Sequence, residues 1–334
     1  MCHIPYFSRL SRACSLVFFI LVLQVPAWAQ NPTPGFHTPL EAHIDTVHRH
    51  LSEMVSETAV QIDDFFLDDR VLEEDNMTRL VFRPGISWED DDGFKSFARF
   101  SLRLRVPKIE KRFNLFLSSA VEDESDAEHT PLDPPEELPG DRDENGINAA
   151  LQYLLKTGRE KNVRFQAGAR LSGEPQLYGG YRFRYYTQAG NHGLRFVQTS
   201  RFFTKDYWDL RATMDVEHKY SDAYLARFTT DVAWYDQGDD GFPHGLSLSL
   251  YHTPTPDRGI QYQLAQYFVT EPDWRDSESV VRVRFRQRVW REWFIFEISP
   301  QVTFPRDKDY DPNPGIVTRC EIVFGYQGNV GDLF

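Results

Sequence analysis

Long apolar runs are missing from this sequence beyond residue 30, and a membrane-spanning helix needs about 20 consecutive, mainly apolar residues. This absence excludes a protein that is anchored by several transmembrane helices. Positively charged residues are also in deficit, because 37 Lys and Arg residues face 50 Asp and Glu residues, a formal net charge of -13. A chain with this charge repels a phosphate backbone, so we expect no nucleic-acid partner.

Cysteine is scarce as well, and its positions matter because residues 1–29 have the layout of a secretory signal peptide. Arg9 and Arg12 precede an apolar run, and the tripeptide Ala-Trp-Ala that ends at Ala29 is a typical cleavage pattern. Cleavage there would change the formal net charge from -13 to -15. It would also remove two of the three cysteines and leave Cys320 alone in the mature chain. We therefore expect export from the cytoplasm and no intramolecular disulfide.

Aromatic residues, in contrast, are abundant at 14%, and they occur in segments that alternate polar and apolar residues. The clearest segment is Ser279 to Phe304, which begins with four arginines at every second position: Arg282, Arg284, Arg286 and Arg288. Only an extended strand converts a period of two into one apolar face and one cationic face. Because a soluble core does not accept a row of guanidinium groups, the apolar face should meet lipid. The segment predicts a hairpin of a membrane barrel, with Arg286 opposite Glu297 across a short turn.

From Arg79 onward the chain divides into segments of this kind, each of roughly a dozen residues, as tilted membrane strands require. The predicted strands are 79–88, 94–106, 111–121, 146–157, 161–171, 176–187, 193–204, 207–219, 222–235, 244–252, 258–270, 279–290, 293–304 and 315–326. The segment 146–157 also fits a helix, but an even number of strands favours a strand there. The prediction is a barrel of about 14 strands, within a range of 12 to 16.

The connections between these segments alternate in length. A periplasmic N-terminus places the even-numbered connections on the periplasmic side, where barrels keep their turns short. The even connections are tight, for example Tyr220-Ser221 and Arg291-Glu292, whereas the odd ones include the longest and most acidic segment, 122–145. Short odd connections at 173–175 and 205–206 depart from this pattern. We expect the segment 122–145 to be exposed at the cell surface.

The chain ends in Phe334, and a terminal aromatic residue is common in barrels that the outer-membrane assembly machinery inserts. Together with the alternating strands, this ending resembles the bacterial outer-membrane β-barrel class over residues 79 to 334. The resemblance implies an all-β, closed antiparallel transmembrane barrel in the outer membrane of a Gram-negative bacterium. It also implies outer-membrane lipid and the barrel-assembly machinery as partners. It indicates no narrower family and no catalytic residue.

A helix is expected between the signal peptide and the barrel. The chain then has three units: the signal peptide (1–29), a periplasmic spacer with the helix (30–76) and the barrel (77–334). Thr38 is a suitable N-cap and Pro39 a suitable first helical residue, and apolar residues then recur at helical spacing up to about Phe66. This periplasmic amphipathic helix packs on the barrel mouth or on itself in one interpretation. In the other, its acidic end is a plug formed by Asp63, Asp64, Asp68 and Asp69.

Strand parity predicts which charged side chains face the lumen. The predicted basic residues are Arg99, Arg103, Arg105, Arg164, Arg170, Arg182, Arg184, Arg195, Arg201, Arg211, Arg227, Arg282, Arg284, Arg286, Arg288 and Arg319. The predicted acidic residues are Asp209, Asp215, Glu217, Asp231, Glu297 and Glu321. Because the arginines outnumber the acids, the parity predicts a net positive lumen, which favours anions in a pore.

Three functions are compatible with this pattern. The first is a narrow, anion-favouring channel that passes small anions. The second is a structural or interaction barrel that does not conduct, because its arginines are paired or plugged. The third is a lipid-modifying enzyme, for which Ser200, Ser247 and Ser249 lack any neighbouring motif, so that no catalytic triad can be assembled and no cofactor is expected.

One acidic stretch offers oxygen atoms at alternate positions. Asp141, Asp143 and Asn145 precede Gly146, like the start of a calcium-binding loop. The twelfth position is Gln152 instead of the bidentate glutamate of an EF-hand, so the stretch departs from that module. The alternative is a solvated acidic surface loop without calcium.

Overall fold

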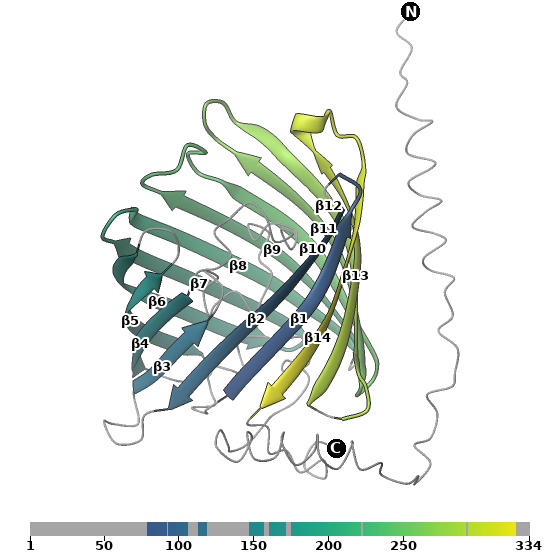
Figure 1. Ribbon diagram of the computed structural model, residues 1–334, viewed down its shortest axis with the longest axis horizontal. Coiled ribbons are helices and arrows are strands. Elements are labelled where there is room, and N and C mark those ends of the chain that lie inside the picture. The colour runs from purple at the N-terminus through teal and green to yellow at the C-terminus, as the bar shows by residue number, and fades with distance from the viewer. Residues whose placement is uncertain are drawn as a thin grey trace, which may run out of the picture. The chain divides into compact units, whose positions relative to one another are not determined.

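The computed structural model describes residues 79–91, 93–105, 113–118, 147–156, 160–171, 175–221, 223–291 and 293–324 (Figure 1). The predicted signal peptide, the N-terminal helix and the terminal Phe334 lie outside these residues. So do the acidic loop 122–145 and the whole predicted calcium-binding stretch up to Gly146, since the described chain resumes at Ile147. Within the described residues no helix is long and apolar enough to cross a membrane.

The described residues form a closed antiparallel barrel in which each strand pairs with its neighbours in sequence and β1 pairs with β14. The strands are β1 (Arg79–Glu89), β2 (Gly93–Arg105), β3 (Phe113–Ser118), β4 (Ile147–Lys156), β5 (Lys161–Leu171), β6 (Gln176–Ala189), β7 (His192–Phe203), β8 (Tyr207–Ser221), β9 (Tyr224–Tyr235), β10 (His244–Thr255), β11 (Arg258–Val269), β12 (Arg275–Arg288), β13 (Phe294–Pro305) and β14 (Asn313–Phe324). The prediction of 14 strands is confirmed, and the ambiguous segment 146–157 contains a strand, β4.

Some strand ends differ from the prediction. β12 begins at Arg275 instead of Ser279, because its backbone continues to pair with β11 down to the pair Arg275 and Val269. The side-chain alternation weakens there, while the backbone still needs hydrogen-bond partners. Side-chain periodicity therefore marks the apolar part of a strand better than its end. A one-turn 3-10 helix, η3 (Arg306–Lys308), lies between β13 and β14.

The two faces of the wall have opposite character. On β11, Leu264 is 55% exposed on the outer face, whereas its neighbour Gln263 is only 5% exposed on the inner face. Leu248 on β10 is exposed in the same way, next to the buried Ser247 and Ser249. An apolar band of this extent is stable only against lipid, so this is a transmembrane barrel of the outer-membrane type.

Aromatic contacts lie at both ends of the strands. At the end of the odd connections the ring pairs are Trp88–Phe94, Phe202–Trp208 and Phe268–Trp274. At the end of the even connections the pairs are His218–Tyr220, Tyr224–His252 and Trp290–Trp293. Two aromatic girdles that flank an apolar band are typical of outer-membrane barrels, because these rings are most stable at the lipid headgroups.

Candidate functional site

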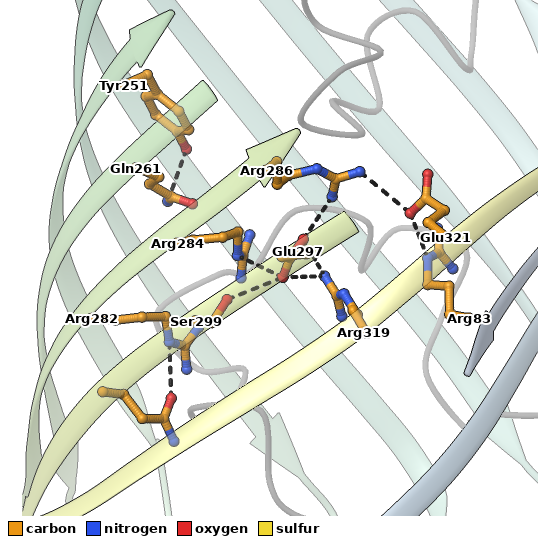
Figure 2. Close-up of polar contacts among 11 residues, drawn as sticks. Arg83, Tyr251, Gln261, Arg282, Arg284, Arg286, Glu297, Ser299, Arg319 and Glu321 are labelled. Atoms are coloured by element: carbon orange, nitrogen blue, oxygen red, sulfur yellow. Dashed lines mark hydrogen bonds and ion pairs between the residues drawn. The ribbon is translucent and has the colours of Figure 1, made fainter. Parts of the chain in front are cut away.

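The buried carboxylate of Glu297 on β13 is the centre of a charged network on the inner wall (Figure 2). Arg286 of β12 lies directly opposite, and its Nη1 donates to Oε2 of Glu297 at 3.0 Å. Arg319 of β14 places its Nη2 3.0 Å from Oε1, and Arg284 places its Nε 3.4 Å from the same oxygen. The Ser299 hydroxyl also donates to Oε1. Three guanidinium groups therefore surround one carboxylate, and the predicted pairing of Arg286 with Glu297 is present.

A second carboxylate, Glu321 of β14, extends this network to the first strand. Its Oε2 accepts a hydrogen bond from Nε of Arg83 at 2.9 Å and lies 3.4 Å from Nη2 of Arg286. Both Glu321 and Arg286 are almost fully buried. The network therefore spans the seam at which β1 and β14 close the barrel. The sequence prediction omitted Arg83, although the parity that places Val81 and Ser87 inside would have identified it.

The four arginines of β12 do not have a common environment. Arg282 donates from Nε to Oε1 of Gln301 at 3.1 Å, and Gln301 donates in turn to Glu89. Arg284 and Arg286 belong to the Glu297 network. Arg288, at the strand end, donates to the carbonyl oxygen of Pro256 in the β10–β11 turn. The predicted row of arginines is thus divided among three different sets of partners.

A second charged network joins β7, β8 and β9. Arg195 donates from Nε to the buried Asp215 at 2.8 Å, and the Thr229 hydroxyl donates to the other oxygen of that carboxylate at 2.6 Å. Arg227 donates from Nε to Glu217 at 2.9 Å. Nearer the odd-connection end, Arg201 donates to Asp209 at 2.6 Å. The acids of β8 therefore neutralise arginines of the two strands beside it.

The other predicted site residues are less uniformly placed. Arg182 and Arg184 are 3% and 1% exposed on the inner face of β6. Arg103 is half-buried on β2, and Arg105 ends that strand, with its side chain outside the described part. The predicted plug residues Asp63, Asp64, Asp68 and Asp69 and the predicted calcium ligands Asp141, Asp143 and Asn145 all lie outside the described residues.

Charge is unevenly distributed around the wall. The sequences of β2, β3, β4, β5, β6 and β7 contain neither aspartate nor glutamate. The described arginines of these strands are Arg99, Arg103, Arg164, Arg170, Arg182, Arg184, Arg195 and Arg201. The buried strand acids lie instead on β8, β9, β13 and β14. The described strands on one side of the barrel therefore contribute basic but no acidic side chains to the inner wall, a grouping that the sequence analysis did not predict.

Metal binding has little support in the part of the chain that the structure describes. No group of three or more His, Cys, Asp or Glu side chains there could hold a metal ion. His192 and His218 lie side by side on β7 and β8, with their Nδ1 atoms 3.2 Å apart, on an exposed part of the surface. One of these rings can donate this hydrogen bond to the other, so the pair needs no metal.

No protein-family model and no curated protein matches this sequence. Among solved structures, the CymD monoaromatic hydrocarbon channel is 10% identical, with a TM-score of 0.48 over 81% of this chain and 94% of that chain. An anion-selective porin from Comamonas acidovorans is 9% identical, with a TM-score of 0.47 over 74% of this chain and 98% of that chain. The outer-membrane channel DcaP of Acinetobacter baumannii is 10% identical, with a TM-score of 0.43 over 74% and 95%. Similarities at this level indicate no common solute.

Proposed function

We propose that this outer-membrane barrel is a channel that favours small anions. The observation that carries the proposal is the absence of aspartate and glutamate from the sequences of β2 to β7, several of which carry arginines on the inner face. In a low-dielectric wall, a row of like charges raises the local concentration of mobile ions of the opposite sign. Basic side chains that line a pore select for anions in this way.

The identity of the basic residues strengthens the proposal. The charged residues on the inner face of β5 to β7 are arginines, which remain protonated at any physiological pH. The positive charge of this wall therefore cannot be lost by titration and must be balanced by mobile anions, by acids of the protein or by a plug. Anion preference should accordingly be constant between about pH 5 and 8, the range in which an unperturbed histidine titrates.

The buried networks favour a second candidate, a structural barrel that does not conduct. Glu297 and Glu321 form ion pairs with arginines of β12, β14 and β1, so acids of the wall neutralise arginines of the wall. Because these charges are balanced within the protein, less net charge remains to attract mobile ions. If the whole inner wall behaves in this way, the barrel is a scaffold and carries no current.

Reversal potential in a planar bilayer under a salt gradient separates the two candidates. An anion channel shifts the potential toward that of chloride, and Arg103→Glu, at a half-buried position of β2, should reduce this shift. Arg103 is a better choice than Arg284 or Arg286, because those side chains bind Glu297 and their loss would also destabilise the wall.

The same measurement on a chain that lacks residues 30–76 tests the predicted acidic plug. If Asp63, Asp64, Asp68 and Asp69 close the passage, the shortened chain should conduct more than the full chain. If both forms insert into the bilayer and neither conducts, the channel proposal is wrong and the structural candidate is correct.

A further inference from the structure

A pocket of about 540 Å³ lies where β11 leads into β12, at the end of the odd connections. Its lining comes from β11, from the β11–β12 connection, from the first residues of β12 and from η3. Pockets that hold small molecules have volumes of roughly 300 to 1,000 Å³. This pocket is therefore large enough for a small ligand.

The residues that β11 contributes to the pocket are on the outer face of the barrel. Gln266 and Phe268 follow Leu264 at every second position of the strand, so they share its outer face. Phe268 also forms a ring pair with Trp274 in the aromatic girdle, which lies at the level of the lipid headgroups. A ligand of this pocket comes from the headgroup layer or from the medium beside it.

A β-bulge brings an acid to the same face. Glu278 of β12 pairs with Tyr267 of β11. The next pair joins Asp276 to Phe268, so Ser277 is an extra residue on β12. In a regular strand Asp276 would share the inner face with Glu278, whereas the bulge turns it to the side of Phe268. Bulges often redirect a side chain at a functional site.

The redirected carboxylate is held by the neighbouring connection. The Tyr310 hydroxyl donates to Oδ2 of Asp276 at 2.6 Å, and Nη1 of Arg306 donates to Oδ1 at 3.3 Å. Arg306 belongs to η3, so the pocket combines residues of two odd connections (Figure 1). A side chain that is restricted in this way loses less conformational entropy when a ligand binds.

Three nearly parallel rings form an aromatic surface beside the pocket. The ring of Phe268 lies 5.0 Å from that of His244 and 5.3 Å from that of Trp274, with interplanar angles of 11° and 13°. Trp274 also donates from Nε1 to Nε2 of His244 at 3.4 Å, which fixes the indole ring. Because Trp274 is 67% exposed, its ring is accessible to a ligand.

The charges of the pocket cancel. Among its described lining residues the acids are Asp273 and Asp276 and the bases are Arg275 and Arg306. A phosphate group would meet as many carboxylates as guanidinium groups, so the lining gives it no net attraction. A neutral ligand with hydroxyl groups suits this lining better, because carboxylates accept its hydrogen bonds and guanidinium groups donate to it.

We propose that this pocket binds a sugar ring. The C–H bonds on the flat face of a sugar pack against an aromatic ring, and the hydroxyl groups at its edge both donate and accept hydrogen bonds. Trp274 and Phe268 supply the aromatic surface, and the charged residues of the lining supply the hydrogen-bond partners. The sugar belongs to a glycolipid of the outer leaflet or to a free saccharide. The site lies on the outer face and does not depend on conduction.

Calorimetric titration of the full chain in detergent tests the site with two probes, lipopolysaccharide and the lipid-free oligosaccharide released from it. Binding of both probes assigns the site to sugars in either form. Binding of lipopolysaccharide alone assigns it to a glycolipid, and binding of the oligosaccharide alone assigns it to a free saccharide. Binding of neither probe overturns the proposal. Phosphatidylglycerol is titrated in parallel, and equal affinity for this sugar-free lipid also overturns it.

Trp274→Ala should weaken binding of the sugar probe by about tenfold or more, because the aromatic surface is lost. Trp274→Phe keeps a ring and should give an intermediate affinity. Asp273→Asn replaces an exposed carboxylate of the lining and should weaken binding by about three- to tenfold, the effect of one weakened hydrogen bond.

Trp208→Ala is the matched control, because Trp208 is an exposed girdle residue at the same end of the barrel and pairs with Phe202. Its affinity for the probe should change less than about twofold. A heat-modifiable band on unboiled gels verifies that each variant is folded. Equal weakening by Trp208→Ala and Trp274→Ala overturns the site, since the probe then binds the girdle in general. A barrel that binds sugar but does not conduct would overturn only the proposed function.

Discussion

Arg83 on β1 donates a hydrogen bond from Nε to Glu321 on β14, 238 residues later in the chain, at 2.9 Å. The two side chains connect the strands that close the barrel, beside the backbone pairs Phe82 with Ile322 and Gly85 with Arg319. Hydrogen bonds between ionised groups are stronger than neutral ones, and here a charged group on each side of the seam is satisfied by the other. A charged contact thus joins the two sides of the seam in addition to the backbone pairing.

Loss of this contact should weaken the seam. We expect Arg83→Met to lower the temperature at which the folded band disappears on unboiled gels, because Glu321 then loses a partner in a buried environment. The matched control is Asp91→Asn, which removes an exposed ion pair with Lys308. This control should leave the transition unchanged, as exposed pairs contribute little. Equal effects of the two variants would contradict a role of Arg83 in closure.

Replacement of the central acid should be more damaging. Glu297→Gln leaves Arg284, Arg286 and Arg319 around a neutral amide, so their mutual repulsion is no longer compensated. Breaking a buried ion pair from one side costs about 3 to 5 kcal/mol, and we expect a loss of this order in urea-induced unfolding from detergent or lipid. Glu297→Asp, which keeps the charge, should recover part of the loss. An unchanged unfolding midpoint would show that these charges are balanced in another way.

The orientation of the wall can be tested with two neighbouring residues of β11. Leu264→Lys places a charge on the exposed outer face and should destabilise the barrel in lipid by about 2 to 4 kcal/mol if it lies near the bilayer midplane. Gln263→Glu places a charge on the inner face, directly opposite Arg282, and should cost less. If Gln263→Glu is the more damaging of the two in lipid vesicles, the assignment of the faces is wrong.

Cys320 provides a probe that needs no mutation. It lies on β14 opposite Phe296, between inward-facing Arg319 and Glu321, so its thiol is on the outer face. In lipid vesicles this thiol should react with an apolar maleimide and resist a charged one, because a charged reagent does not enter the apolar layer. Mass spectrometry of the labelled protein measures both reactions. Fast labelling by the charged reagent in intact vesicles would place Cys320 in water.

Local patterns in the sequence were sufficient to predict the strands. A period of two separates the faces without reference to any other strand, and the hairpin of β12 and β13 has a turn short enough to place Arg286 opposite Glu297. The same reasoning identified Arg182, Arg184 and Asp215 as inward residues, and all three are buried. It did not fix strand ends such as Arg275, because backbone pairing continues where side-chain alternation has stopped.

The sequence by itself therefore determined the number of strands, their two faces and the pairing within the short hairpin, all of which depend on residues close together in the chain. Only the tertiary structure decided which charges meet. Arg83 reaches Glu321 because the barrel closes, and Arg319 joins Glu297 because the register of β13 and β14 is set across a connection that contains η3. Closure and register depend on the hydrogen bonding of the whole sheet, and a shift of one residue would turn these side chains toward lipid.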